Sequence, residues 1–106
     1  MSEYILYQQM LPAPEQIVAM TGSSVLIGTL NHIPVKLILD NQSTAPVVLS
    51  ISLDNGESLT QWKTFAGQEA LILDDDFYTF PKGTQFYGNG GASGSFSLAY
   101  TYVNNF

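Results

Sequence analysis

Three consecutive aspartates, Asp74, Asp75 and Asp76, are the residues with the clearest capacity for chemistry. Carboxylate oxygens are the ligands that calcium prefers, so the cluster predicts a weak cation site. A dedicated calcium loop alternates its ligands with other residues, whereas these aspartates are adjacent, which is more typical of a solvated turn. Nothing in the sequence separates the pKa of one carboxyl from that of the next, so the cluster does not predict an acid and base pair. We favour the solvated turn and keep the cation site as the alternative.

The other candidate groups lack the partners that catalysis or metal binding needs. His32 is the only histidine and the chain has no cysteine, so a typical zinc site cannot form, and no triad spacing is present. Residues 88–94 include four glycines, but neither a lysine nor a helix start follows them, as a phosphate-binding loop requires. Ser95 stands where a nucleophile elbow needs a glycine. We therefore expect no catalytic residue, no resident metal and no cofactor, and we predict that the protein is not an enzyme.

The composition excludes several classes of partner. Three lysines and no arginine stand against nine acidic residues, giving a net charge of -6, which argues against binding the phosphates of nucleic acid. No apolar run approaches the roughly 20 residues that cross a bilayer, so we expect no membrane span. Charged residues make up only 11% of the chain, so the surface must consist largely of neutral polar groups. Such a surface suits packing against neighbouring molecules.

The stretch 35–56 carries the clearest structural pattern. Apolar residues stand at every second position in two runs, which are joined by a polar segment ending in Pro46. We predict a β-hairpin with one face turned inward, followed by a tight turn at Asn55-Gly56. The alternating residues are Val35, Leu37 and Leu39 in the first run and Val47, Leu49, Ile51 and Leu53 in the second.

Short strands separated by turn signals continue through the chain. The cleanest is 95–103, with bulky residues on one face and small residues on the other, so that another surface can approach closely. About eight such strands predict an all-β, single-domain antiparallel β-sandwich of jelly-roll type over residues 1–106. Pro12 and Pro14 exclude a helix or a central strand near the N-terminus, so we expect residues 1–15 to form an extended arm or an edge strand.

Aromatic residues offer a second reading of the surface. Trp62, with Tyr78, Tyr87, Tyr100 and Tyr102, predicts a platform on which sugar rings can stack, whereas the alternative is that Trp62 fills the core or an interface. We expect an interface with other subunits to use Tyr4, Leu6, Tyr7, Pro12, Pro14, Trp62, Tyr100 and Tyr102.

An ordered set of features gives the chain a family resemblance. After the apolar hairpin come Gly67 ahead of the short run 70–73, the turn Pro81-Lys82-Gly83-Thr84, the glycine loop 88–94 and the closing segment 97–102, SLAYTY. Over about residues 35–103 the chain resembles the small β-sandwich virion proteins of bacteriophages. The resemblance implies a capsid decoration, cement, vertex or spike-base protein of the virion, which associates with itself and with other virion proteins.

These observations together predict a non-enzymatic structural protein of a virus particle. We expect a homo-oligomer that contacts other capsid or virion proteins and binds no nucleic acid. The alternative is a carbohydrate-binding β-sandwich that recognises host glycans through the aromatic residues, and a glycan therefore stays among the expected partners.

Overall fold

The structure, a computed structural model, describes residues 10–73 and 80–103. These residues form nine strands and no helix, arranged in two antiparallel sheets, so the predicted all-β antiparallel β-sandwich is confirmed. The strands are β1 (Met10–Pro12), β2 (Gln16–Ala19), β3 (Ser24–Thr29), β4 (Pro34–Asn41), β5 (Val47–Ser52), β6 (Thr60–Phe65), β7 (Ala70–Leu73), β8 (Gln85–Asn89) and β9 (Ser95–Val103).

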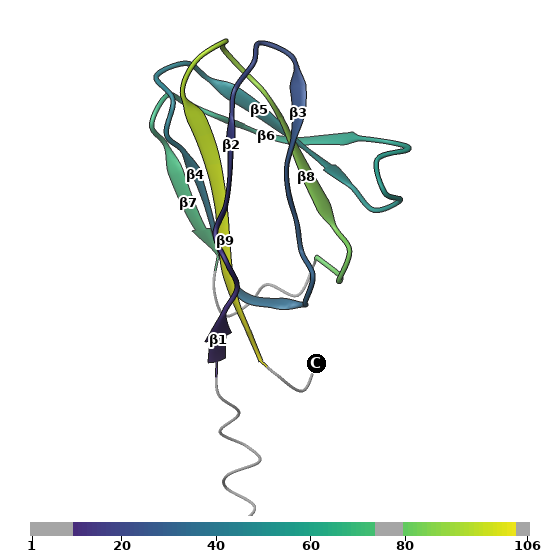
Figure 1. Ribbon diagram of the computed structural model, residues 1–106. Coiled ribbons are helices and arrows are strands. Elements are labelled where there is room, and N and C mark those ends of the chain that lie inside the picture. The colour runs from purple at the N-terminus through teal and green to yellow at the C-terminus, as the bar shows by residue number, and fades with distance from the viewer. Residues whose placement is uncertain (1–9, 74–79, 104–106) are drawn as a thin grey trace, which may run out of the picture.

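The strand order is that of a jelly roll. Sheet A has the order β1-β9-β4-β7, with β2 also paired to β9, and sheet B has the order β3-β8-β5-β6 (Figure 1). Both β1 and β2 lie along β9, and between them the amide of Ala13 donates to the carbonyl oxygen of Tyr100 at 2.9 Å. Pro12 and Pro14 interrupt this edge because proline has no amide hydrogen to donate to a ladder. Counted as one interrupted strand, β1 and β2 leave eight strands in the two-sheet jelly-roll arrangement.

The predicted β-hairpin over residues 35–56 is wrong. Strand β4 pairs with β7 and β9 in sheet A, whereas β5 pairs with β6 and β8 in sheet B, so residues 42–46 cross from one sheet to the other. Alternation correctly identified the inward side chains, and Leu37, Leu39, Val47 and Leu49 are all buried in the core. The pattern cannot separate a hairpin from a crossing between sheets, because both place every second residue toward the core.

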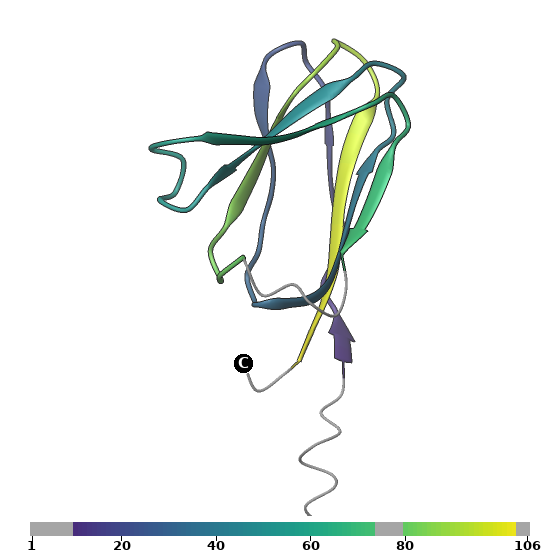
Figure 2. The ribbon, with the colours of Figure 1, turned by 180° about the vertical axis from the view of Figure 1, so that it is seen from behind.

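The turn at Asn55-Gly56 is confirmed. Asn55 has φ 61° and Gly56 has φ 91°, as a tight turn between paired strands requires, and the turn joins β5 to β6. The β5–β6 hairpin extends away from the sandwich, to the right in Figure 1 and to the left in the reverse view of Figure 2. Leu53 near its tip is 67% exposed, although it continues the apolar alternation of β5, because the hairpin has by then passed the end of the core.

A buried asparagine holds one end of the sandwich together. The Asn41 side chain donates from Nδ2 to the carbonyl oxygens of Ala45 at 3.0 Å and Ala66 at 2.9 Å. Its Oδ1 accepts from the amide of Ser43 at 3.0 Å and from the Ser43 hydroxyl at 2.7 Å. Asn41 therefore joins the two corners at which the chain passes between the sheets, 42–46 and 66–69, and satisfies their polar groups.

Candidate functional site

A β-bulge places the only tryptophan at the margin of the core. Between β5 and β6 the register shifts, so that Leu49 pairs with Lys63 and the next residue, Ser50, pairs with Gln61. Trp62 is the extra residue of this bulge, and a bulge commonly redirects a side chain to the other face of its sheet. Its ring packs edge to face with Phe80 at a centroid distance of 5.4 Å and at 84°, and it is 37% exposed. Trp62 therefore partly fills the core and partly faces solvent.

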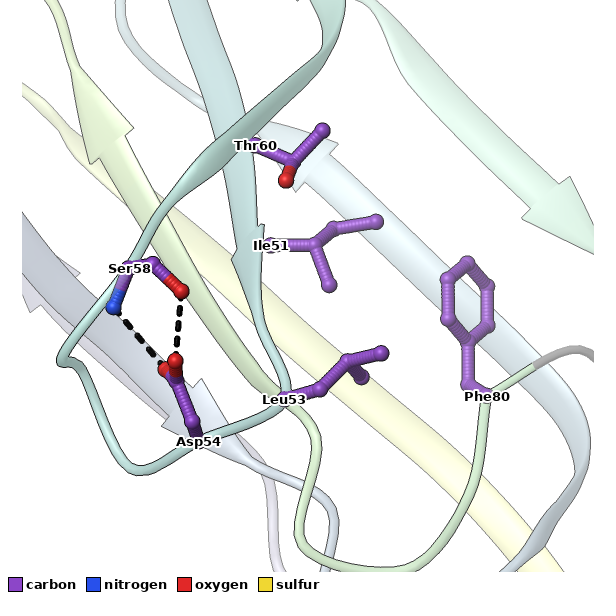
Figure 3. Close-up of a pocket in the computed structure, with 6 residues that line it drawn as sticks. All are labelled: Ile51, Leu53, Asp54, Ser58, Thr60 and Phe80. Carbon is purple, nitrogen blue, oxygen red and sulfur yellow. Dashed lines mark hydrogen bonds between the residues drawn. The ribbon is translucent and has the colours of Figure 1, made fainter.

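A pocket of about 340 Å³ opens beside Phe80, along one side of the β5–β6 hairpin from Ile51 to Asp54. Figure 3 shows the side chains of Ile51 and Leu53 pointing toward Phe80, with the Asp54–Ser58 pair on the far side of Ile51 and Leu53 from Phe80. Thr60, opposite Ile51 in the ladder, completes the lining. A half-open, mainly apolar pocket next to an exposed tryptophan is suited to an apolar side chain or to the flat face of a sugar.

The one carboxyl group of the pocket is engaged in the hairpin itself. Asp54 Oδ1 accepts from the amide of Ser58 at 2.9 Å and from the Ser52 hydroxyl at 2.8 Å, and Oδ2 accepts from the Ser58 hydroxyl. The hydrogen bonds from Ser58, followed by that from Ser52, lower the pKa of Asp54 to about 2. The carboxylate is therefore ionised near neutral pH and orders the hairpin tip, with no proton to give to a substrate.

The outer face of sheet A is a second candidate surface. On β4 the inward Leu37 and Leu39 alternate with Lys36, Ile38 and Asp40, which point outward. The ladders place Ala99 of β9 and Ile72 of β7 on either side of Ile38. The Gln42 side chain, which follows β4, also lies over this face, donating to Asp40 Oδ2 and Ser97 Oγ and accepting from Ser95 Oγ. The remaining outward residues of the strands are small or apolar: Pro12, Ile17, Ala19, Ala70, Ser95, Ser97 and Thr101. The predicted small-residue face of 95–103 is confirmed, and it forms the middle of this surface.

This face exposes large apolar side chains at both of its edges. Ile17 on β2 is 56% exposed and Ile72 on β7 is 57% exposed, while Ile38 between them is half-buried. Within the described part of sheet A, Lys36 and Asp40 are the only residues of the face that carry a charge. The strands of this face thus present a mostly apolar surface with one charge of each sign, bordered by the exposed Glu15 between β1 and β2, and so many exposed apolar groups are unusual for a face left in contact with water.

Two of the predicted surface tyrosines lie around the histidine instead. Tyr100 is 4% exposed, and its hydroxyl accepts from the amide of Asn31 at 3.0 Å and lies 2.9 Å from His32 Nδ1. The ring of His32 stacks on that of Tyr102 at 3.6 Å and 7°. Burial raises the pKa of Tyr100, so its hydroxyl stays neutral and serves this cluster as a hydrogen-bonding group.

The described members of the predicted aromatic platform, Trp62, Tyr87, Tyr100 and Tyr102, are not brought together. Trp62 contacts Phe80 and Phe86, whereas Tyr100 and Tyr102 surround His32, and the Tyr87 hydroxyl donates to Gln85. Pro12 lies in β1 and Pro14 is exposed between β1 and β2. The remaining predicted residues lie outside the described part of the chain: Tyr4, Leu6, Tyr7, Asp74, Asp75, Asp76 and Tyr78.

Sequence reasoning missed that Lys36 and Asp40 lie on either side of Ile38 on the same outer face. Alternation along β4 places all three on one face, but their neighbours on β9 and β7 become visible only with the sheet order. Among residues 10–73 and 80–103, no group of three or more histidine, cysteine or acidic side chains is placed to hold a metal ion. The same residues include no helix long and apolar enough to cross a membrane. No family model, curated protein or solved structure matches the chain.

Proposed function

We propose that this chain is a non-enzymatic structural component of a virus particle, which acts by associating with copies of itself and with other virion proteins. The observation that carries the proposal is the outer face of sheet A, where Ile17, Ile38 and Ile72 lie in a neutral surface of small residues. Leaving such a face in water costs free energy, at about 25 cal/mol per Å² of apolar area, which burial against a neighbour recovers.

The fold is compatible with this proposal. Two-sheet jelly rolls occur in viral capsid proteins and also in lectins, so the architecture is compatible with assembly and with sugar binding. The apolar face favours assembly, because an extended sheet face suits another protein better than a small molecule, which needs a concave site.

Sedimentation equilibrium tests self-association directly. We expect a concentration-dependent oligomer in the low micromolar range, and a monomer persisting at about 100 μM would refute the proposal. The virion assignment has its own test. Mass spectrometry of particles purified from the virus that encodes the chain is expected to find it in a fixed ratio to the major capsid protein, and its absence from such particles would refute the assignment.

A second candidate function is glycan recognition at the β5–β6 hairpin. The observation that favours it is the half-exposed Trp62 beside an open pocket of about 340 Å³. Trp62 is the only tryptophan and packs against Phe80, which lines the pocket, so its fluorescence responds to changes beside the pocket without interference from another tryptophan. Titration with a glycan panel should shift its emission in the parent chain and give no response in Leu53→Ser, which alters the pocket wall. An unchanged emission with every glycan would eliminate this function.

A further inference from the structure

We propose that two copies of the chain pack through the outer faces of sheet A, around a two-fold axis that runs across the strands along the row Ala99–Ile38–Ile72. The inference rests on the proposed function and deepens it by naming the partner, the face and the symmetry. It places Lys36 of one copy opposite Asp40 of the other, twice in each dimer.

Packing of the two faces is sterically straightforward. The row along the axis is formed by Ala99 on β9 and Ile38 on β4, which leave room for a second sheet, while the Gln42 side chain lies to one side of this row, over Ser97 and beside Asp40. Face-to-face sheets normally lie about 10 Å apart, a distance that interdigitating Ile and Ala side chains fill. The exposed Ile17 and Ile72 at the edges would then lose contact with water.

The charges select one orientation. A two-fold axis between stacked faces must lie in the plane of the interface, and the arrangements that keep the strands of the two sheets aligned place it either along the strands or across them. An axis along β4 would bring Lys36 against Lys36 and Asp40 against Asp40 of the second copy, which is unfavourable. An axis across the strands at Ile38 places β4 of the second copy over β4 of the first, running in the opposite direction. Because Lys36 and Asp40 lie equally far from Ile38, each Lys36 then faces Asp40 of the other copy.

The apolar edge agrees with the same axis. Ile17 pairs with Ser97, which lies in the row of Asp40, and Pro12 pairs with Thr101, which lies in the row of Lys36. Reversing the strands therefore brings the exposed Ile17 of one copy toward the exposed Pro12 of the other. Both the polar and the apolar parts of the face are self-complementary, which is the requirement for an isologous dimer and a reason to choose a second copy as the occupant.

The size of the face is also adequate. Four strands side by side at about 4.8 Å and the eight residues of β4 at about 3.3 Å each give a projected area of roughly 500 Å². The side chains make the solvent-accessible area larger than this projected area. It therefore approaches the area of a standard protein interface, about 800 Å² per partner.

Charge reversal and charge exchange test the inference. Asp40→Lys creates two like-charge pairs per dimer and should weaken dimerisation at least about 100-fold in sedimentation equilibrium. The double variant Lys36→Asp with Asp40→Lys restores opposite pairs and should return the dissociation constant to within about fivefold of the parent value. Lys82→Asp, in the turn before β8 and away from sheet A, is the matched control and should leave it unchanged. Unchanged Trp62 fluorescence confirms that each variant is folded.

A crosslinking measurement covers the case in which charge variants misfold. The chain has no cysteine, so Ile38→Cys introduces a single thiol on the axis, and a short bismaleimide should then link two copies. Ser93→Cys, in the exposed loop before β9, should not be linked. An oligomer that is insensitive to Asp40→Lys and gives no crosslink at Ile38→Cys overturns this inference but leaves the proposed function standing. A monomeric parent chain overturns both.

Discussion

Replacing Asn41 by alanine is expected to lower the free energy of unfolding by about 2 to 4 kcal/mol. The side chain makes four hydrogen bonds with the two corners, and its removal leaves two carbonyl oxygens and the amide and hydroxyl of Ser43 without this partner. A buried group that loses its partner costs about 1 to 3 kcal/mol. The total lies near the lower end of what four such losses would give, because Ala66 is exposed to water and the Ser43 hydroxyl keeps its hydrogen bond to the Ala45 carbonyl oxygen at 3.0 Å.

Urea denaturation followed by the fluorescence of Trp62 measures this loss, at one fixed protein concentration because association also stabilises the fold. Thr44→Ala, an exposed position of the same corner, is the control and should change stability by less than about 0.5 kcal/mol. Asn41→Asp keeps the acceptor oxygen but turns a carboxylate toward the two carbonyl oxygens. That repulsion raises the pKa of the introduced carboxyl, so its destabilisation should shrink as the pH falls and the carboxyl takes up a proton. A loss below about 1 kcal/mol for Asn41→Ala would refute the role of this residue at the corners.

Three further changes test other parts of the structure. Gly94 and Gly83 both have positive φ, but a Cβ on Gly94 would collide with Ser43, whereas one on Gly83 would meet nothing within 4 Å. Thermal unfolding should therefore show that Gly94→Ala lowers the free energy of unfolding by about 3 kcal/mol and Gly83→Ala by about 1 kcal/mol. Thr101 Oγ1 is buried without a hydrogen-bond partner in the described structure. Thr101→Val should therefore raise the free energy of unfolding by about 1 kcal/mol, which would appear as a higher urea midpoint. The pKa of Asp54 is lowered to about 2, so the stability that its carboxylate gives to the hairpin is fully present above the unfolded pKa of 3.8 and is lost as the pH falls through 2. Asp54→Asn should therefore speed amide hydrogen exchange in the hairpin at pH 6 but make no difference near pH 1.5.

Alternation made the core of the sandwich predictable from the sequence. Phe96 and Leu98 share the bulky face that a period of two gives to β9, and they are buried with inward residues of β4 and β5. Tyr100, on the same face, was predicted to lie at an interface but is buried beside His32. The partners of each strand were not predictable in the same way. Neighbours in a jelly roll are far apart in sequence, as β4 and β9 are, and a period of two carries no information about which strand lies alongside.

The candidate sites depended on the features that alternation does not encode. Trp62 faces the core because a single extra residue shifts the register of β6, and a bulge has no fixed sequence signature apart from glycine in some types. Asn41 looks like an ordinary turn residue in the sequence, yet it is fully buried because two distant corners supply its partners. The outer face of sheet A required four separate segments to be brought together, of which 95–103 alone was recognised in advance.

The two candidate surfaces lie on different sheets and need not compete. The pocket and Trp62 belong to the β5–β6 hairpin of sheet B, which projects away from sheet A in both views (Figures 1 and 2). A dimer formed through sheet A would therefore leave both hairpins exposed, with Leu53, Leu59 and Trp62 available on each copy. Two identical apolar projections on one rigid dimer would bind a repeating partner, such as a symmetric shell, with an avidity that neither copy alone could reach. Self-association through one sheet and attachment through the other would together account for both exposed apolar regions of a protein with so few charges.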